Sequence, residues 1–136
     1  EGHYKLAYKL FLSEPLLGIG PRGFRYYCRS VMYDPEVGIC STHPHNITFQ
    51  ILSETGILGI IFYMAGLLFI LRNLIKVYKI QNKNVDNYCF LISSLGIIIY
   101  LFPFLPSGNM FNNWISISNF YMFALYFYSY KRIFKI

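Results

Sequence analysis

The side chains best suited to chemistry in this sequence are concentrated between positions 40 and 54. His43 and His45 flank a single proline, and an imidazole, which titrates near working pH, suits the role of a general base. Polar residues come after His45, and the steps from Asn46 to Gln50, and from Gln50 to Ser53 and Glu54, are three or four positions long. At helical spacing these side chains share one face. A polar stripe that leads into an apolar helix usually lines a cavity, so we expect this stripe to contact substrate.

Three arginines upstream form a second polar group, at Arg22, Arg25 and Arg29. A guanidinium is permanently charged, and its planar fork binds two phosphate oxygens at once. The group can therefore hold a pyrophosphate, with Arg25 as the favoured ligand. Binding of anionic lipid head groups, or capping of local carbonyls, is the open alternative for each arginine.

A zinc site is another chemistry that these residue types allow, because sulfur and imidazole are the usual ligands of zinc. Cys40, His43 and His45 carry such atoms, but neither the Cys-x-x-Cys nor the His-x-x-x-His spacing of common zinc sites is present. The sequence also lacks an Asp-x-Asp pair that would hold a divalent ion. We therefore expect no metal ion and no other cofactor.

Two of the three cysteines, Cys28 and Cys40, bracket a loop of eleven residues. We predict that they form a disulfide on the oxidising side of a membrane, where closing a loop of this length contributes about 3 kcal/mol by the chain-entropy estimate. This bond would hold the arginine group against the histidines. Cys89 lies in an apolar run and is predicted to be a packed thiol.

The elements that must position these residues belong to a membrane protein, because 55% of the residues are hydrophobic and only 13% are charged. The twelve lysines and arginines fall into three separate groups rather than one basic stripe, which argues against a nucleic-acid-binding surface. We predict an all-α integral membrane fold. Since the chain begins without Met or a signal peptide, we also expect the C-terminal part of a longer protein.

The first elements are predicted to lie at the membrane surface. Residues 2–14 read as a short amphipathic helix, whose apolar face is formed by Tyr4, Ala7, Tyr8 and Phe11. It is too short and too charged to span a bilayer. The glycines and prolines of residues 15–25 then predict a loop. The next helix is predicted to start at Pro44, with Thr42 or His43 as its cap.

Three apolar runs predict three transmembrane helices, at about residues 57–78, 88–105 and 114–130. Basic clusters follow the first and the third run, and the positive-inside rule places both clusters in the cytoplasm. Residues 1–56 are then a periplasmic region, with an amphipathic helix and a loop, and residues 57–136 form the membrane region. The connection before the third run lies on the same outer side, and its polar and aromatic residues are Asn109, Asn112, Asn113 and Trp114.

Two motifs connect the chain to a known family. His45-Asn46 is followed after nine residues by Gly56-x-x-Gly59, and it is preceded by Pro-Leu-Leu-Gly-Ile-Gly-Pro at 15–21. This combination resembles the O-antigen ligase family, which includes O-antigen polymerases. The resemblance implies a multi-span glycosyltransferase of the bacterial inner membrane. It would move a glycan from undecaprenyl pyrophosphate to an acceptor hydroxyl on the periplasmic side.

The resemblance also implies roles for single residues. His45 corresponds to the catalytic histidine, Gly56 and Gly59 to structural positions, and the loop arginines to pyrophosphate ligands. We expect Asn46, Gln50 and Glu54 to support the substrate from one helix face. The acceptor stays open between lipid A core, a second lipid-linked glycan and a protein hydroxyl.

A second class of protein fits the same composition. A non-enzymatic transporter or flippase component for lipid-linked glycans would also need spans, arginines and a polar cavity. Loss of glycan transfer in His45→Ala, with normal binding of the lipid substrate, would separate the enzyme from such a carrier.

Overall fold

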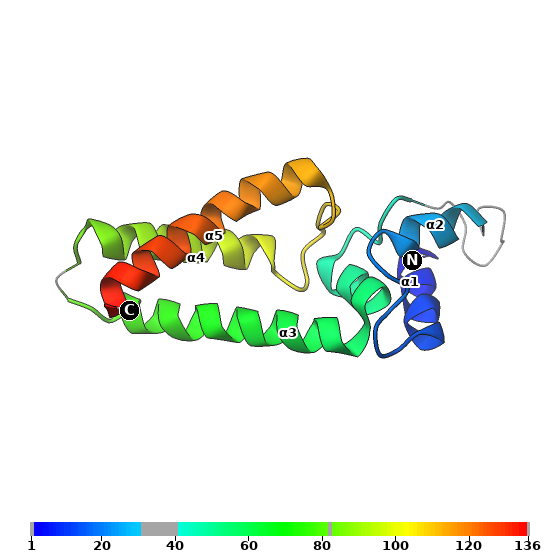
Figure 1. Cartoon of the computed structure of the whole chain (residues 1–136), viewed down its shortest axis with the longest axis horizontal. Coiled ribbons are helices and arrows are strands. Elements are labelled where there is room, and N and C mark those ends of the chain that lie inside the picture. The colour runs from blue at the N-terminus through cyan, green and yellow to red at the C-terminus, as the bar shows by residue number, and fades with distance from the viewer. Residues whose placement is uncertain (1, 31–40, 82, 136) are drawn as a thin grey trace. The chain divides into compact units, whose positions relative to one another are not determined.

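The computed structural model describes residues 2–30, 41–81 and 83–135 of the chain, and its regular elements over these ranges are helices (Figure 1). In chain order they are α1 (Gly2–Ser13), α2 (Gly23–Ser30), α3 (Ile47–Tyr78), α4 (Val85–Tyr100) and α5 (Asn113–Phe134). An isolated backbone bridge joins Asn46 to Pro106. The prediction of an all-α chain is confirmed for these described ranges.

The chain divides into two compact units. The first consists of Glu1–Met64 with Pro103–Ile115, and the second of Ala65–Phe102 with Ser116–Ile136. The first unit contains every residue predicted for the functional site, so its construction decides where those residues lie.

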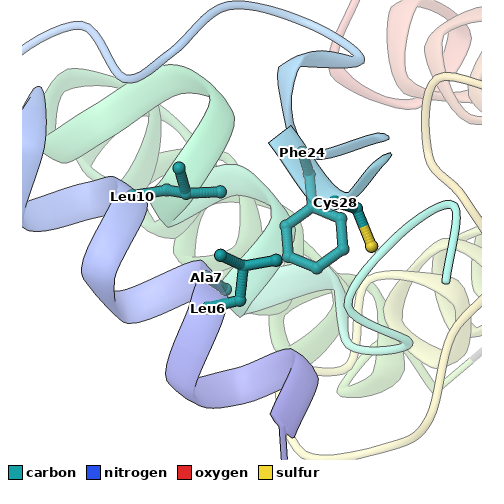
Figure 2. Packing of buried hydrophobic residues seen from close by; sticks show 5 residues of the cluster. All are labelled: Leu6, Ala7, Leu10, Phe24 and Cys28. Atoms are coloured by element: carbon teal, nitrogen blue, oxygen red, sulfur yellow. The ribbon is translucent and has the colours of Figure 1, made fainter. Parts of the chain in front are cut away.

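In the first unit, α1 and α2 share a small hydrophobic core (Figure 2). Its buried side chains are Leu6, Ala7 and Leu10 from α1 with Phe24 and Cys28 from α2. Helix α2 has only eight residues, and a helix of that length is not stable alone in water. Burial of Phe24 against α1 therefore stabilises the helix that carries Arg25 and Arg29.

The buried face of α1 differs from the predicted one. Tyr4 and Tyr8 are 40% and 52% exposed, whereas Leu6 and Leu10 are buried. A tyrosine keeps its hydroxyl in water, while aliphatic side chains have no such need, so the aliphatic stripe faces the core. Tyr4 instead stacks on Phe49 with 4.8 Å between the ring centroids.

The loop predicted over residues 15–25 is shorter than expected. Helix α2 begins at Gly23, so Phe24 and Arg25 are helical. The side chain of Glu54 explains this early start, because one of its carboxylate oxygens accepts a hydrogen bond from the backbone N–H of Phe24 at 3.1 Å. A carboxylate oxygen there satisfies one of the N–H groups that have no partner within the first turn of a helix.

Helix α3 contains a break at Gly56, where φ is 65° and ψ is −161°. In an unbroken α-helix the N–H groups of Ile57 and Leu58 would bond to the carbonyls four residues earlier, those of Ser53 and Glu54. The positive φ turns the backbone and separates these pairs. Figure 1 shows α3 changing direction close to its start.

The loop segment 15–20 provides new partners for all four groups. The hydrogen bonds run from Ile57 N to Pro15 O (2.9 Å), Leu58 N to Leu16 O (3.4 Å), Ile19 N to Ser53 O (3.0 Å) and Gly20 N to Glu54 O (3.0 Å). We call this arrangement the backbone exchange. It leaves the four groups at the break satisfied, although the helix itself no longer pairs them.

The backbone exchange explains the glycines at positions 18 and 56. Both have φ in the left-handed region, 67° for Gly18 and 65° for Gly56. A Cβ atom on Gly18 would lie 2.5 Å from the carbonyl carbon of Glu54, and one on Gly56 would lie 2.7 Å from the nitrogen of Gly18. Only glycine allows the loop and the helix to approach this closely.

The start of α3 is defined by Asn46. Its Oδ1 atom accepts hydrogen bonds from Thr48 N at 3.0 Å and Phe49 N at 3.2 Å. The prediction of a start at Pro44 with Thr42 or His43 as cap is therefore wrong. An asparagine side chain directly before the first turn reaches two free N–H groups, which the earlier residues do not.

The segment Pro103–Ile115 attaches to the same end of α3. Asn46 Nδ2 donates to Pro103 O at 2.9 Å, and Thr48 Oγ1 donates to the same carbonyl at 3.1 Å. The N–H of Ser107 donates to His45 O at 3.0 Å. These bonds fix a segment far away in sequence beside the predicted catalytic histidine.

The second unit contains the rest of α3 with α4 and most of α5. Helix α4 starts with a reciprocal capping box between Asn84 and Asn87. Phe90 of α4 packs on Tyr126 of α5, with 4.7 Å between the ring centroids. This unit holds none of the predicted site residues.

Among the described residues, α3 is the helix that is long and apolar enough to cross a membrane. Of its most apolar window only 17% is buried, so most of those side chains present surface that lipid would cover. Helix α4 is apolar but has 16 residues. Helix α5 has 22 residues but carries polar side chains such as Asn119 and Ser129 along its length. The second and third spans therefore stay predictions.

Candidate functional site

Three histidines form a cluster at the start of α3. The ring centroid of His45 lies 4.2 Å from that of His43 and 5.6 Å from that of His3, which comes from α1. His45 Nε2 shares a hydrogen bond of 2.9 Å with Ser41 Oγ, and His43 Nδ1 shares one of 3.0 Å with Thr42 Oγ1. His45 is exposed to solvent, so its ring is open to an incoming molecule.

Burial lowers the pKa of both His3 and His43, and the neighbouring His45 lowers each pKa further. For His43 the backbone of Ser107 acts in the opposite direction, although the buried Nε2 atom makes no hydrogen bond of good geometry. A charged imidazole is disfavoured away from water and beside a second cation. At neutral pH the lowered pKa values favour neutral rings at His3 and His43.

A cavity of about 390 Å³ lies next to the cluster in the first unit, within the range of about 300–1,000 Å³ that small-ligand sites occupy. Its lining residues are Arg22, Arg25, Thr42, His43, Gly108, Asn109, Phe111, Asn112, Trp114 and Ile115. The lining includes His43 but not His45, whose ring centroid lies 4.2 Å from that of His43. The cavity combines two positive charges with amide, hydroxyl and aromatic groups.

The two cavity arginines are held by different devices. Arg22 has φ of 66° in the turn before α2, and its Nη2 atom donates to Phe111 O at 3.2 Å. Arg25 occupies the first turn of α2, which the core under Phe24 holds in place. Arg29 lies one turn further along α2, is exposed, and is not part of the cavity lining.

Below the cavity, the polar stripe of α3 forms a buried hydrogen-bond network. Gln50 and Glu54 are each only 1% exposed. Gln50 Nε2 donates to Glu54 Oε2 at 3.0 Å and to Asn109 Oδ1 at 2.8 Å, while Gln50 Oε1 accepts from Met110 N at 3.1 Å. Asn46, Gln50 and Glu54 thus face one way, as predicted, and their observed contacts are to the protein itself.

The stripe therefore connects the two walls of the cavity. Glu54 bonds to the start of α2 through Phe24 N, and the backbone of Arg22 also hydrogen-bonds this carboxylate. Gln50 bonds to the segment 103–115 through Asn109 and Met110. A change in α3 would move both the arginines and the opposite wall.

The predicted structural residues have separate positions. Gly56 allows the backbone exchange. A Cβ atom on Gly59 would collide with the side chain of Thr55. The Oγ1 atom of Thr55 donates to Ile51 O at 2.7 Å. Cys28 lies in the core of α1 and α2 and is disulfide-bonded. Cys40 lies outside the described residues, so its pairing with Cys28 stays a prediction. Cys89 is a free thiol.

Two parts of the site were missed or only partly seen in the sequence. His3 was not considered, although it shares the helical spacing of Leu6, Ala7 and Leu10 and so lies on the buried side of α1. For the segment 103–115, the sequence indicated only that Asn109, Asn112, Asn113 and Trp114 lie on the outer side of the membrane. The hydrogen bonds that bring it to α3 join residues more than fifty positions apart, which no local pattern reveals.

No group of three histidine, cysteine or acidic side chains in the described ranges is arranged to hold a metal ion. The charged groups of the cavity are arginines, which bind anions such as phosphate.

The comparisons with known proteins agree with the motifs. Residues 3–64 match a family model described as O-antigen ligase. Searches of curated proteins and of solved structures gave no match. The family is membrane-associated and indicates a glycosyltransferase of the ligase or polymerase type, which acts on lipid-linked glycans and their acceptors. The segment that carries the histidine cluster, the cavity arginines and the backbone exchange is thus the segment that matches the O-antigen ligase family.

Proposed function

We propose that this chain carries catalytic and donor-binding groups of a membrane glycosyltransferase. The reaction moves a glycan from undecaprenyl pyrophosphate to an acceptor hydroxyl on the periplasmic side of the bacterial inner membrane. The observation that supports this most directly is the cavity in which Arg22 and Arg25 face the same space as His43, whose ring lies 4.2 Å from that of His45.

In the proposed step, the acceptor hydroxyl gives its proton to His45 while its oxygen attacks the anomeric carbon of the glycan. The bond between that carbon and the pyrophosphate oxygen breaks, and its electron pair leaves with the pyrophosphate. The leaving group gains negative charge in the transition state. The guanidinium groups of Arg22 and Arg25 stabilise this charge in the cavity.

The histidine cluster suits a ring that receives a proton. Because His3 and His43 favour their neutral forms, an imidazolium formed at His45 has no charged neighbour within the cluster. The hydrogen bond with Ser41 orients the His45 ring. The exposure of His45 leaves room for an acceptor to approach from solvent.

Three buried polar residues, one directly before α3 and two within it, position the cavity walls. We assign Asn46, Gln50 and Glu54 the role of holding the cavity walls, because their polar atoms bond to Pro103, Asn109 and the start of α2. Direct contact of these three with substrate stays a prediction. Arg29 adds positive charge one turn beyond Arg25 on the same helix, outside the cavity lining.

The proposed orientation follows from the basic clusters and from α3. The part of α3 after Gly56 crosses the membrane inward, which leaves residues 1–56 on the periplasmic side. A donor that already carries its glycan across the membrane on a lipid can reach this side, whereas cytosolic nucleotide sugars cannot.

The experiment that tests the function compares glycan transfer and donor binding in His45→Ala. We expect transfer to fall at least about a hundredfold, the usual contribution of a positioned general base, with donor binding close to that of the unchanged protein. Tyr26→Ala is the control, because Tyr26 is exposed on α2 and outside the cavity lining. Normal transfer by His45→Ala would exclude the catalytic role and leave the alternative of a non-enzymatic carrier.

A further inference from the structure

We propose that the segment Gly108–Ile115 forms a saccharide subsite, in which Trp114 supports the sugar ring next to the pyrophosphate. This inference rests on the proposed function and adds to it. It assigns the part of the cavity lining that comes from residues 108–115, a wall that lies outside the family match at residues 3–64.

The first argument is the composition of that wall. Trp114 lines the cavity and is nevertheless 82% exposed, so most of its indole is available for a ligand. Asn109 and Asn112 lie in the same lining, with Thr42 beside them. The negative face of an aromatic ring attracts the C–H groups of a sugar, and amide and hydroxyl groups bond to sugar hydroxyls.

The second argument is that the wall is already held in place. Phe111 N donates to Asn109 Oδ1 at 2.9 Å, and Trp114 N donates to Asn112 Oδ1 at 3.1 Å. Gln50 in turn bonds to Asn109 and to Met110 N. A binding surface that is ordered before the ligand arrives loses less conformational entropy on binding.

The third argument is the distribution of charge across the cavity. The charged groups of the lining are the guanidinium groups of Arg22 and Arg25, whereas the segment 108–115 contributes neutral amides and aromatic rings. A sugar pyrophosphate has the same division between an anion and a neutral ring with apolar C–H faces. Arg22 lies at the junction, because its Nη2 atom bonds to the carbonyl of Phe111. The sugar that is bonded to the pyrophosphate would therefore lie over Trp114.

The hydrocarbon chain of a lipid is the competing ligand for Trp114, since tryptophans also anchor proteins at the membrane interface. The cavity favours the sugar, because a hydrocarbon chain would displace water from the polar side chains of Thr42, Asn109 and Asn112 and offer them no hydrogen bond in return. The two ligands differ in one measurable respect. Undecaprenyl pyrophosphate carries the hydrocarbon chain but no sugar, so its binding reports on the lipid without the sugar.

The test measures equilibrium binding of two radiolabelled lipids to the full chain in nanodiscs of phosphatidylethanolamine and phosphatidylglycerol. One lipid is undecaprenyl pyrophosphate, and the other is the undecaprenyl pyrophosphate-linked glycan purified from the cells that produce the protein. The variants are Trp114→Leu and Trp114→Tyr. Tyr121→Leu is the control, because Tyr121 is exposed on the same helix and outside the cavity lining.

We expect Trp114→Leu to weaken binding of the glycan-linked lipid by roughly five- to tenfold and to leave binding of the sugar-free lipid within about twofold. Trp114→Tyr keeps an aromatic face and should retain most of the affinity. Equal weakening for both lipids would assign Trp114 to the lipid instead, and no weakening for either would exclude contact. Either result overturns the subsite.

Failure of the subsite and failure of the proposed function give different results. Binding requires no transfer, so a selective effect of Trp114→Leu would stand even if His45→Ala kept full transfer. Conversely, loss of transfer in His45→Ala with no selective effect at Trp114 would keep the function and remove the subsite.

Discussion

Gln50 Nε2 donates a hydrogen bond of 2.8 Å to Asn109 Oδ1, and this contact joins a buried position of α3 to the far wall of the cavity. The two residues are fifty-nine positions apart in the chain. Gln50 also bonds to Glu54, whose carboxylate holds the start of α2. One amide therefore sets the distance between the arginine wall and the aromatic wall.

Replacement of Gln50 by Leu should destabilise the first unit. The change leaves Asn109 Oδ1, Glu54 Oε2 and Met110 N short of a buried partner, which costs about 3 kcal/mol in the free energy of unfolding. Thermal unfolding in detergent measures this loss. Gln81→Leu is the matched control, because Gln81 is exposed, and equal melting temperatures for the two variants would contradict the network.

Gly56→Ala should be damaging, because Ala at φ of 65° is strained and its Cβ would press against the backbone of Leu16 and Gly18. We expect a loss on the order of 3 kcal/mol. Gly66→Ala in the same helix is the control, since a Cβ there meets no atom within 4 Å. That variant should be neutral or slightly more stable, as alanine favours helices. A Gly56→Ala protein as stable as Gly66→Ala would refute the backbone exchange.

Arg25→Lys should impair transfer although the charge is kept. An ammonium group lacks the fork that binds two phosphate oxygens, so kcat/KM should fall about tenfold or more. Steady-state kinetics with the lipid-linked glycan tests this. Arg72→Lys is a suitable control, because Arg72 is exposed in the second unit. Unchanged kinetics for Arg25→Lys would remove Arg25 from the donor site.

Stability should decrease as the pH falls below about 6.5, where unfolded histidines begin to take up protons. The folded chain holds the pKa of His3 and His43 below that value. Above pH 6.5 both states are neutral at these rings and the contribution to stability is complete. Below it the unfolded chain binds protons that the folded chain does not, so the free energy of unfolding declines. Melting temperatures at pH 7.5 and 5.5 measure the slope. A His3→Gln/His43→Gln double variant should show a smaller slope, and an unchanged slope would assign the pH effect elsewhere.

The orientation in the membrane gives another prediction. A reporter fused after Ile136 should be active in the cytoplasm, and one inserted after Ser30 should be active in the periplasm, because basic clusters stay inside. The reverse pattern would place the histidine cluster on the cytoplasmic side and contradict the proposed donor.

The sequence predicted those features that depend on local pattern. Helical spacing identified α1 and the polar stripe of Asn46, Gln50 and Glu54, whose side chains are buried and of which Gln50 and Glu54 are hydrogen-bonded to each other. The composition after Gly56 predicted a long apolar helix, and α3 has that character. The motifs around His45 and Gly56 led to the family that residues 3–64 match.

Features that depend on contacts between distant segments were not predictable in the same way. The pattern on α1 favoured its tyrosines, whereas packing against Phe24 selected Leu6 and Leu10. Capping by Asn46 replaced the expected cap because side-chain geometry, rather than residue type alone, decides which N–H groups are reached. Trp114 belongs to the segment 103–115, which is attached to α3 by hydrogen bonds to Asn46 and Gln50, more than fifty positions earlier in the chain.

The backbone exchange also limits how the length of this chain can vary. Two donors and two acceptors on each segment are matched one to one, from Pro15 to Gly20 and from Ser53 to Leu58. An insertion or deletion of one residue within either segment shifts the donors against the acceptors, and each backbone group left buried without a partner would cost about 1–3 kcal/mol. The length of both segments is therefore constrained by backbone pairing, in addition to the two glycines that the close approach requires.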